Sequence, residues 1–387
     1  MLKNMVPSRN LLNWSEKREL ATKAYQKKDE IFMKKALALA KKGLGKTSPN
    51  PPVGAVLVQN NKIITTGWHK KAGGLHAEIK AIQSAQKRGL ETLGSTLYLS
   101  LSPCCHFGKT GPCTKAIIEA GIKKVVSGVL DPNPLSKETP KILEKHGIKF
   151  LSDVLKKESK EIIRGHEKFI KKKLPFVTLK IAMSLNGKIS GQKKRYLTNE
   201  LSRKYVHKLR SQKDAIITGI GTILKDDPHL GVRLVSGHEP LRVILDSSLK
   251  IPLNAKVLRD RNVLIVTTNS SPKEKQKLIR GKTNMIVYKD EIKIKRLLKN
   301  LGQRGIREVL VEGGMKINTT FFSEKMFDEA LFFVAPITIK KGKNFVSKNV
   351  KNFDISFHKM KTFDRDLLFF GKLKKRIQSL PISKKNP

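Results

Sequence analysis

The chain has 387 residues, enough for two domains of ordinary size. Apolar residues make up 39% and charged residues 29% of the sequence, and no apolar run reaches the roughly 18 residues of a membrane-spanning helix. Three cysteines are too few for a disulfide scaffold of this length. Because the polar, basic N-terminal stretch lacks the layout of a signal peptide, we expect a cytoplasmic protein.

The charge balance is strongly basic, with 79 Lys and Arg against 32 Asp and Glu and a formal net charge of +47. Such a charge attracts nucleic acid, anionic lipid surfaces or phosphorylated substrates. A general lysine bias is the other explanation, and two observations favour it. The lysines are spread over the whole length, and aromatic residues, which stack on bases, amount to only 6%. A small phosphorylated substrate is compatible with both explanations.

Residues 1–28 are expected to form a basic extension that is loosely ordered or partly helical. From Asp29, whose side chain suits an N-cap, apolar residues recur at helical spacing until two glycines end the pattern. The pattern then predicts a hairpin at 54–66, helices at 76–86 and 114–120, and strands at 96–100 and 124–129. This alternation predicts that residues 29–152 form a domain with an open sheet covered by helices.

Residues 153–174 are predicted to form a charged linker helix that ends before Pro175. A second alternating set follows, with strands predicted at 176–182, 215–219, 243–246, 263–267, 308–312 and 330–335. We therefore expect a second α/β domain at 175–372. The last residues, 373–387, form a basic tail that we expect to be frayed.

Three residues of the first predicted domain have the character of zinc ligands. His76 opens a predicted helix, and Cys104 and Cys113 each follow a proline. One imidazole and two thiolates give a tetrahedral zinc site three protein ligands and leave the fourth position to water, whose pKa the ion lowers. Glu78 would then accept the proton of that water and return it to the ring nitrogen and the departing amine. The pattern therefore predicts hydrolytic deamination.

The spacing of the two cysteines differs from that in the zinc deaminase signature. Zinc deaminases carry His-x-Glu and Pro-Cys-x-x-Cys, whereas here eight residues separate Cys104 from Cys113. A surface histidine with two buried cysteines is the competing explanation, and the order of the three residues around alternating elements disfavours it. We interpret Cys105 as non-ligating, because adjacent side chains rarely point to one metal. For His106, a substrate contact and a solvated side chain stay open.

Two strands of the second predicted domain run into glycine, at Gly219-Ile220-Gly221 and at Gly313-Gly314. A strand end that opens into glycine before a helix lets backbone N–H groups approach phosphates. Each signal is weak alone. The first lacks the third glycine of the dinucleotide-binding fingerprint, so a tight turn is the favoured explanation there.

Several motifs together resemble one known family. The segment 103–113, Pro49–Gly54 and Asp131–Pro134 resemble the bifunctional riboflavin-biosynthesis deaminase/reductases, and the resemblance runs from about residue 29 to 372. It implies an N-terminal domain with a cytidine-deaminase-like α/β/α layer fold. That domain would deaminate a diaminopyrimidinone carrying ribose phosphate, with Asn50 contacting the pyrimidine. A turn residue in a proline-rich loop is the alternative for Asn50.

The resemblance also covers the second domain, through 180–188, 209–210, 221–222, 226–228 and 311–314. It implies a dihydrofolate-reductase-like α/β fold and hydride transfer from NADPH to C1 of the ribosyl group, through an opened imine, giving the ribityl chain. The implied cofactor contacts are Ala182, Tyr196, Thr222, Asp226, Ser247, Gly314, Met315, Lys316, Ile317, Asn318, Thr319 and Thr320. The implied substrate contacts are Lys194, Arg210, Leu230, Arg233 and Glu312. Arginine forks suit a ribose phosphate, although in so basic a chain a solvated charge is the alternative for both arginines.

The chain departs from the family pattern outside the zinc ligands and Glu78. Ser102 replaces a glutamate, Asn186 an aspartate, Lys194 a serine, Tyr196 a tryptophan and Gly231 a threonine, and Lys137–Pro140 replaces Ala-Gly-Arg-Gly. These changes concern loops and pocket details. They therefore bring affinity or efficiency into question before reaction type, with a partly degenerated copy as the alternative.

The leading hypothesis is a cytoplasmic two-domain enzyme that uses Zn²⁺ and NADPH for consecutive deamination and reduction of a small phosphorylated pyrimidine. The resemblance implies a homo-oligomer, and neither a membrane nor a nucleic acid partner is expected. A tRNA deaminase with an accessory domain is the runner-up: it would use the basic charge, but the cysteine spacing opposes it. A non-catalytic basic scaffold or RNA-binding regulator that keeps a zinc fold is the third hypothesis. Glu78 argues against it, because a structural zinc site needs no general base.

Overall fold

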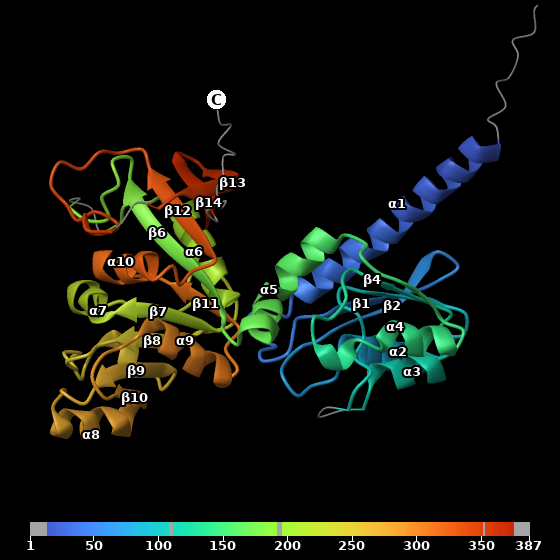
Figure 1. The fold of residues 1–387 in the computed structure, drawn as a ribbon, viewed down its shortest axis with the longest axis horizontal. Helices are drawn as coiled ribbons and strands as arrows, with labels where there is room; N and C mark the ends of the chain where they lie inside the picture. Colours follow the sequence, from blue (N-terminus) through green and yellow to red (C-terminus); the bar gives the residue numbers. More distant parts are fainter. Residues whose placement is uncertain (1–13, 108–110, 192–195, 351–352, 375–387) are drawn as a thin grey trace, which may run out of the picture. The chain divides into compact units, whose positions relative to one another are not determined.

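The computed structural model describes residues 14–107, 111–191, 196–350 and 353–374, with side chains from residue 27 on. The chain divides into two compact units (Figure 1). The first unit contains the helix before Gly43 and residues 51–163. The second unit contains residues 164 onward and the short segment Leu44–Asn50. Within the described residues, we find no helix with the length and apolar character that crossing a membrane requires.

The first unit is a five-stranded sheet between two layers of helices. The strands are β1 (Gly54–Gln59), β2 (Lys62–Trp68), β3 (Thr96–Leu99), β4 (Lys124–Ser127) and β5 (Lys149–Leu151), in the order β2-β1-β3-β4-β5. β1 is antiparallel to β2 and β3, and β3, β4 and β5 are parallel. The helices are α1 (Trp14–Lys41), α2 (Ala77–Lys87), α3 (Cys113–Glu119), α4 (Thr139–Lys145) and the short η1 (Pro134–Ser136).

The alternation of side chains along β1 divides this unit into two hydrophobic cores. Val56 and Val58 face α1 and the first half of α5 (Lys156–Lys172). Ala55 and Leu57 face the opposite core, which α2, α3 and α4 cover. Because both faces are covered, all strand positions of β1 except the last are buried. α2 and α3 therefore lie on the same face, and their N-termini carry two of the three predicted zinc ligands, His76 and Cys113.

The predicted start of the first helix at Asp29 is wrong, because α1 already begins at Trp14. The sequence between them contains four lysines, two glutamates and two alanines, all good helix formers, and neither glycine nor proline. Asp29 lies inside the helix and is buried. Its carboxylate accepts hydrogen bonds from Tyr98 Oη (2.6 Å) and Lys124 Nζ (2.9 Å), so it has a tertiary partner in place of a capping role.

The second unit is built on a nine-stranded sheet in the order β10-β9-β8-β7-β11-β6-β12-β14-β13. The first seven strands in this order are parallel, and β14 and β13 are antiparallel to their neighbours. The bounds are β6 (Phe176–Ser184), β7 (Ala215–Gly219), β8 (Leu241–Leu245), β9 (Val263–Thr268), β10 (Asn284–Tyr288), β11 (Glu308–Val311), β12 (Glu329–Ala335), β13 (Ile355–Phe363) and β14 (Asp366–Leu373).

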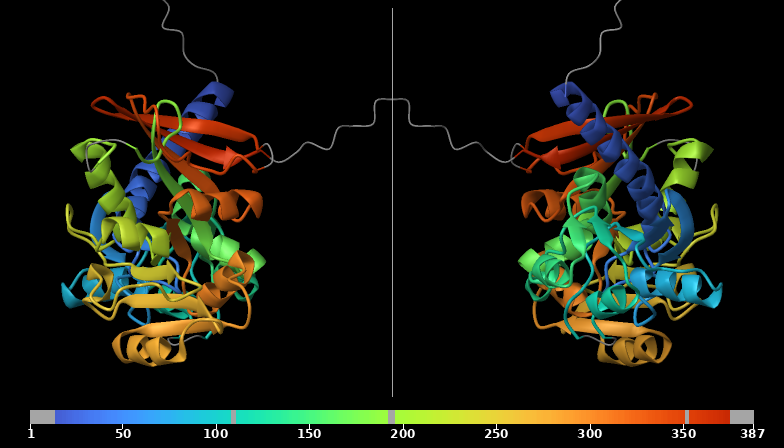
Figure 2. Two further views of the ribbon diagram at one scale, coloured as in Figure 1. Left: turned by 90° about the vertical axis from the view of Figure 1, so that its left-hand side faces the viewer. Right: turned by 90° about the vertical axis from the view of Figure 1, so that its right-hand side faces the viewer.

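Helices cover both faces of this sheet. α9 (Ile294–Gln303) and α10 (Met315–Ser323) cover one face, and α6 (Glu200–Ser211), α7 (Ile220–Asp226) and α8 (Lys273–Lys282) cover the other. A short helix, η2 (Lys256–Leu258), follows β8. Both views of Figure 2 show the β13–β14 hairpin (red) and α8 (orange) at opposite ends of this unit. The parallel strands bring several loops to one edge of the sheet, where α/β proteins bind their ligands.

The second half of α5 is held in the second unit by buried ion pairs. Arg164 Nε lies 3.1 Å from Glu308 Oε1, and Arg164 Nη1 lies 3.3 Å from Glu329 Oε2. Lys168 Nζ lies 2.6 Å from Asp328 Oδ2. Glu308, Asp328 and Glu329 stand at the beginnings of β11 and β12. These pairs therefore lie at the edge of the sheet opposite to the loops that follow its strands.

Candidate active sites

The three predicted zinc ligands of the first unit converge in space. His76 is the N-cap of α2, Cys113 is the first residue of α3, and Cys104 lies in the loop after β3. Their ligand atoms all lie within 4.8 Å of one another, with His76 Nδ1 3.1 Å from Cys113 Sγ and 3.7 Å from Cys104 Sγ. Ligands of a tetrahedral zinc ion are separated by about 3.5–4 Å, given metal–ligand bonds of about 2.0–2.3 Å. This donor set therefore fits a zinc ion.

The sulfur atoms of Cys104 and Cys113 share a hydrogen bond. A hydrogen bond from the Cys113 thiol lowers the pKa of Cys104 to about 4, while the same interaction raises the pKa of Cys113. The backbone N–H of Cys113, the first residue of α3, also lowers the pKa of Cys104 by hydrogen bonding to its sulfur. The pair therefore carries thiolate character beside an imidazole, which is what a cation with a preference for nitrogen and sulfur requires.

Glu78 lies in the first turn of α2, two residues after His76, and is only 4% exposed. Burial, together with the negative charge on Cys104, raises the pKa of Glu78 to about 7. Its carboxylate is not part of the converging ligand set. A buried carboxyl group beside the ligands, but not one of them, is placed to take up and release a proton.

Sequence reasoning missed His69, which supports this site. Its ring lies edge-to-face against that of His76, with the centroids 5.4 Å apart, and its Nδ1 is 3.0 Å from Leu75 O. Burial lowers the pKa of His69, so the neutral ring is favoured. No motif marked this residue, because its contact with His76 arises only when the loop between β2 and α2 folds back.

The loop that carries Cys104 is fixed by the segment after β4. Ser102 Oγ accepts a hydrogen bond from Asp131 N at 2.8 Å, in the position where the family has a glutamate. Cys105 Sγ donates to Leu135 O at 3.2 Å and is not part of the converging ligand set. His106 is half-buried, and its Nδ1 lies 3.3 Å from Phe107 O.

Asn50 belongs to the segment Leu44–Asn50, which groups with the second unit. Its backbone N–H donates to Thr47 O at 2.9 Å. This hydrogen bond fits the turn that we considered as the alternative. A contact between Asn50 and the pyrimidine stays a prediction.

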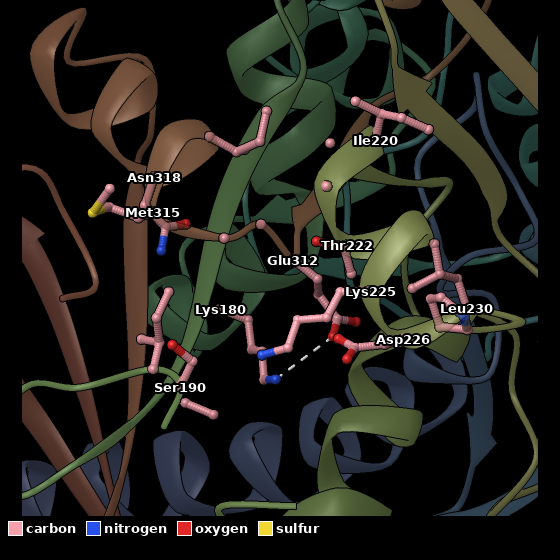
Figure 3. A pocket seen from close by; sticks show the side chains of 18 of the residues that line it. Lys180, Ser190, Ile220, Thr222, Lys225, Asp226, Leu230, Glu312, Met315 and Asn318 are labelled. Atoms are coloured by element: carbon pink, nitrogen blue, oxygen red, sulfur yellow. Dashed lines mark ion pairs between the residues drawn. The ribbon is translucent and has the colours of Figure 1, made fainter. Parts of the chain in front are cut away.

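The second unit contains a cavity of about 1930 Å³ at the ends of β6, β7, β8 and β11. Ordinary ligand pockets measure about 300–1,000 Å³, so this one has room for two molecules side by side. Among the described residues, ten lysines and arginines line it against three acids, which favours anionic ligands. Figure 3 shows labelled side chains from several elements around this one hollow.

Most residues that the resemblance implied for the reductase site line this cavity. They are Ala182, Tyr196, Arg210, Thr222, Asp226, Leu230, Arg233, Ser247, Glu312, Gly314, Met315, Lys316, Ile317, Asn318 and Thr320. Thr319 does not line it; its hydroxyl accepts a hydrogen bond from Ser347 N at 2.8 Å. Lys194 lies outside the described residues.

A buried ion-pair cluster forms part of the cavity wall. Arg210 Nε and Nη2 lie 2.6 Å and 3.0 Å from the two carboxylate oxygens of Glu312. Lys180 Nζ lies 3.6 Å from Glu312 Oε2 (Figure 3). Burial opposes the charge on Glu312, but Arg210 and Lys180 outweigh it and lower its pKa to about 2. Burial lowers the pKa of Lys180. Sequence reasoning quoted Lys180 only as part of a motif and assigned it no role.

His207 and Arg233 form a second part of the wall that sequence reasoning only half found. His207 Nδ1 accepts a hydrogen bond from the backbone N–H of Arg233 at 2.9 Å. Burial first, and then the positive charge of Arg210, lower the pKa of His207 to about 4. The ring is therefore neutral near pH 7 and can keep accepting this bond, which holds the loop of Arg233 against α6.

At each of the two strand ends, one glycine is packed against Ile317 and the other faces open space. A Cβ atom on Gly219 would lie 2.8 Å from Ile317 Cγ1, and one on Gly313 would lie 2.5 Å from Ile317 Cβ, so both make room for Ile317. Gly221 and Gly314 have nothing within 4 Å of such an atom and line the cavity. Gly314 is also the N-cap of α10 without a side-chain cap, so the first-turn N–H groups of α10 are open to an anion.

Two departures from the family pattern have local partners in this chain. Asn186 Nδ2 donates to Ile339 O at 3.1 Å, and its Oδ1 accepts from Ile339 N at 3.2 Å, a reciprocal pair that an aspartate cannot form because it has no donor. The carbonyl of Gly231 accepts from Arg210 Nη1 at 3.0 Å. A Cβ atom at Gly231 would lie 2.5 Å from His229 Nδ1, so a threonine would displace that ring.

Two family models match the chain, one in each unit. The model "Cytidine and deoxycytidylate deaminase zinc-binding region" matches residues 26–129, and the model "RibD C-terminal domain" matches residues 175–369. The Riboflavin biosynthesis protein RibD of Aquifex aeolicus is 38% identical over 353 residues, covering 89% of this chain and 98% of that protein. RibD of Bacillus amyloliquefaciens is 37% identical over 319 residues, covering 80% of this chain and 85% of that protein.

Solved structures give the same result. The diaminohydroxyphosphoribosylaminopyrimidine deaminase/5-amino-6-(5-phosphoribosylamino)uracil reductase of Thermotoga maritima superposes with a TM-score of 0.81 at 35% identity. One crystal form of Acinetobacter baumannii RibD superposes with a TM-score of 0.81 at 31% identity. Both comparisons cover 90% of this chain and 100% of the other. The similarity therefore includes both units.

Proposed function

The chain belongs to the RibD family of riboflavin-biosynthesis enzymes, which join a pyrimidine deaminase to a reductase, and from this premise we propose how its residues divide the two reactions. The first unit hydrolyses the exocyclic C–N bond of a 2,5-diaminopyrimidin-4-one that carries ribosylamine phosphate, releasing ammonia. The second unit reduces the ribosyl group of the deaminated product to ribityl phosphate with NADPH. The observation that carries this proposal is the convergence of His76, Cys104 and Cys113 beside the buried Glu78.

In the first unit, His76, Cys104 and Cys113 would hold the metal through one nitrogen and two sulfur atoms. A zinc ion bound there supplies Lewis acidity, which makes water a nucleophile at neutral pH. Glu78 takes the proton of the attacking water and returns it to the pyrimidine nitrogen and to the departing amine. Burial of Glu78 keeps its carboxyl group away from bulk water, so the proton stays within the site.

In the second unit, the open N-terminus of α10 with Gly314 suits the pyrophosphate of a bound NADPH. NADPH would supply the hydride. The proposed cofactor contacts are Ala182, Tyr196, Thr222, Asp226, Ser247, residues 314–318 and Thr320, all of which line the cavity. Asn50 is a proposed contact of the pyrimidine. Glu312, held by Arg210 and Lys180, presents fixed charge to the sugar end of the substrate. Leu230, Arg233 and Lys194 complete the proposed substrate contacts.

The second half of the chain argues against the nucleic-acid deaminase that we considered as an alternative. The relatives match both units, and the cavity of the second unit has room for a dinucleotide and a ribotide together. We therefore infer a small phosphorylated pyrimidine as the substrate. A cytoplasmic location and a homo-oligomeric assembly are further parts of this proposal, which rest on the family alone.

The test is a coupled measurement on one purified sample. Zinc is determined by atomic absorption, deamination of the diaminopyrimidinone ribotide by ammonia release, and reduction by the loss of NADPH absorbance. We expect about one zinc ion per chain and stoichiometric ammonia and NADPH turnover. If the protein left the ribotide unchanged but deaminated added tRNA, the result would instead support the nucleic-acid deaminase.

A further inference from the structure

The turn after β8 contains a buried carboxylate beside the reductase cavity. Asp246, the first residue after β8, is 1% exposed. Its Oδ1 accepts a hydrogen bond from Lys250 N at 2.9 Å, and its Oδ2 accepts one from Ile251 N at 2.8 Å. Within the described part of the chain, Asp246 forms no ion pair. Both of its oxygens therefore bind the backbone of the turn that follows, and neither binds a charged side chain.

The shape of this turn depends on the Asp246 carboxylate. Ile251 is fully buried, and a buried backbone N–H without an acceptor costs free energy. Leu249 has a φ of +52°, in the left-handed region that a leucine rarely adopts, and its buried side chain packs in the core that contains Ile223 and Ile244. Such a conformation persists only where the surroundings impose it. Asp246 supplies the two hydrogen bonds that do so here.

The same turn holds Ser247 in a fixed position. Ser247 O accepts hydrogen bonds from Thr267 Oγ1 at 3.1 Å and from Thr268 Oγ1 at 2.9 Å. Asp246 N donates to Val266 O at 2.9 Å, so the end of β9 fixes the backbone on both sides of this peptide. The Ser247 side chain is exposed and lines the cavity, and its hydroxyl has no hydrogen-bond partner among the residues that the structure describes. A fixed hydroxyl with no internal partner is available to a ligand.

The order of the strands indicates which ligand lies nearer to this turn. β8 is the direct neighbour of β7, whose end carries Gly219 and, just beyond it, Gly221, and both glycines line the cavity. Glu312 follows β11, on the other side of β7, two strand spacings or about 10 Å from β8. The turn is therefore closer to the glycines that suit a dinucleotide than to the carboxylate that faces the sugar of the substrate.

We propose that Asp246 is a positioning residue for the cofactor, which fixes the turn at 247–251 and thereby holds the Ser247 hydroxyl where NADPH binds. This inference rests on the proposed reductase function, which it deepens. Asp246 itself does not contact the cofactor, because both of its oxygens are buried and engaged. A turn that is already ordered reduces the entropic cost of binding. The effect of Asp246 therefore falls on cofactor affinity and not on the chemical step.

The test measures cofactor affinity in Asp246→Asn, in the full-length zinc-loaded protein. The asparagine offers one acceptor oxygen and one NH₂ group, so one N–H of the turn loses its partner. We expect the dissociation constant for NADP⁺, from calorimetric titration, to rise about tenfold. The KM for NADPH should rise by a similar factor, with kcat and the KM for the deaminated ribotide within about twofold of wild type.

Asp214→Asn is the matched control for loss of a buried carboxylate. Asp214 is also buried, and its Oδ2 accepts hydrogen bonds from Arg307 N at 2.7 Å and from Glu308 N at 2.8 Å. It precedes β7, at the edge of the sheet opposite to the cavity, and does not line the cavity. This variant should lower the temperature of thermal unfolding, as Asp246→Asn does, without changing the dissociation constant for NADP⁺.

A double variant shows whether Asp246 acts through Ser247. We expect Ser247→Ala alone to weaken NADP⁺ binding by about fivefold, because one hydrogen bond is lost. Asp246→Asn combined with Ser247→Ala should bind NADP⁺ no more weakly than Asp246→Asn alone, because in the altered turn the hydroxyl no longer reaches the cofactor.

Hydrogen exchange of the wild-type protein adds a measurement that needs no substitution and stays decisive if Asp246→Asn does not fold. The amide groups of Lys250 and Ile251 should be protected before any cofactor is added, because Asp246 already binds them. Rapid exchange of both amides in the folded wild type would overturn the proposal.

Three results with the variants would also overturn it. They are an NADP⁺ dissociation constant within about twofold of wild type in folded Asp246→Asn, equal losses in Asp246→Asn and Asp214→Asn, and losses at 246 and 247 that add up in the double variant. Wild-type protein that binds NADP⁺ but does not reduce the ribotide would instead refute the proposed function, while the NADP⁺ titrations would still decide the role of Asp246.

Discussion

The Nδ1 atom of His76 lies 3.1 Å from the Sγ atom of Cys113, although 37 residues separate them in the chain. The two residues begin different helices, α2 and α3, which cover the same face of the sheet. The hydrophobic core between these helices therefore brings the ligand atoms together before any metal binds. This arrangement predicts that zinc binding requires all three ligands, whereas folding of the first unit does not require zinc.

Substitution of one ligand should remove the metal. We expect Cys113→Ser to lose zinc and ammonia release, because a serine hydroxyl is a far poorer ligand than a thiolate. Cys105→Ser is the matched control, since the Cys105 thiol bonds to Leu135 O outside the ligand set. It should keep both zinc and activity. Zinc determination after dialysis against a chelator checks this, and full zinc retention by Cys113→Ser would contradict the assignment.

Substitution of Glu78 should separate metal binding from chemistry. We expect Glu78→Gln to retain zinc and to lose deamination by roughly 10²–10⁴-fold, because the amide cannot carry the proton between water and amine. Reduction of the deaminated intermediate by NADPH should not change, since that reaction belongs to the second unit. Glu119→Gln, at an exposed position of α3, controls for the lost negative charge. If Glu78→Gln abolished both activities with zinc and fold intact, the division of labour would be wrong.

A functional residue could be predicted from the sequence only where its immediate neighbours in the chain mark it. The zinc ligands could be predicted because each stands at a helix start or in a strand–helix loop, and because local sequence marks it: His76 is followed by Glu78, and each cysteine follows a proline. Lys180 carries no such mark in the sequence, because its role depends on Glu312, which lies more than a hundred positions away, just after the neighbouring strand β11.

The missed elements have the same physical explanation. β13 was not predicted because it is an edge strand with most of its side chains exposed, so it lacks the apolar alternation of a half-buried strand. α6 was not predicted because its cavity-facing side carries arginine and histidine where a helix of the core has apolar residues.

Glu312 predicts how the second unit responds to acid. Its pKa of about 2 in the folded protein lies below the value of about 4.3 in an unfolded chain, so folding favours the charged form. The resulting stabilisation is fully present above about pH 4.3 and is lost as pH falls toward 2. Glu312→Gln leaves Arg210 and Lys180 without a carboxylate and should destabilise this unit by about 3–5 kcal/mol at neutral pH. It should also flatten the acid-dependent part of the decline.

Hydrogen exchange of β11 in denaturant titrations at fixed pH measures this effect locally, because the strand ends at the residue before Glu312. Glu239→Gln is a suitable control, since this exposed carboxylate accepts a hydrogen bond from Val232 N on a loop and removes the same charge without taking a partner from Arg210's fork. Equal acid sensitivity of the wild type and of Glu312→Gln would show that the ion pair with Arg210 does not control stability.

Gly219 and Gly221 allow the turn and the phosphate explanations of their motif to be separated. A methyl group on Gly219 would meet Ile317 Cγ1 at 2.8 Å, so we expect Gly219→Ala to lower the free energy of unfolding by about 1–3 kcal/mol through overcrowding. Gly221 lies in α7, lines the cavity and has open space around such a methyl. Gly221→Ala should therefore leave the free energy of unfolding equal or slightly higher, because alanine is the better helix former.

If backbone N–H groups at this turn approach a phosphate of the cofactor, the same methyl group at position 221 weakens NADP⁺ binding by about tenfold. A loss of about 1.4 kcal/mol accompanies a lengthened charged hydrogen bond. Calorimetric titration with NADP⁺ measures that loss, and unchanged affinity in Gly221→Ala would leave the tight turn as the complete explanation of both glycines.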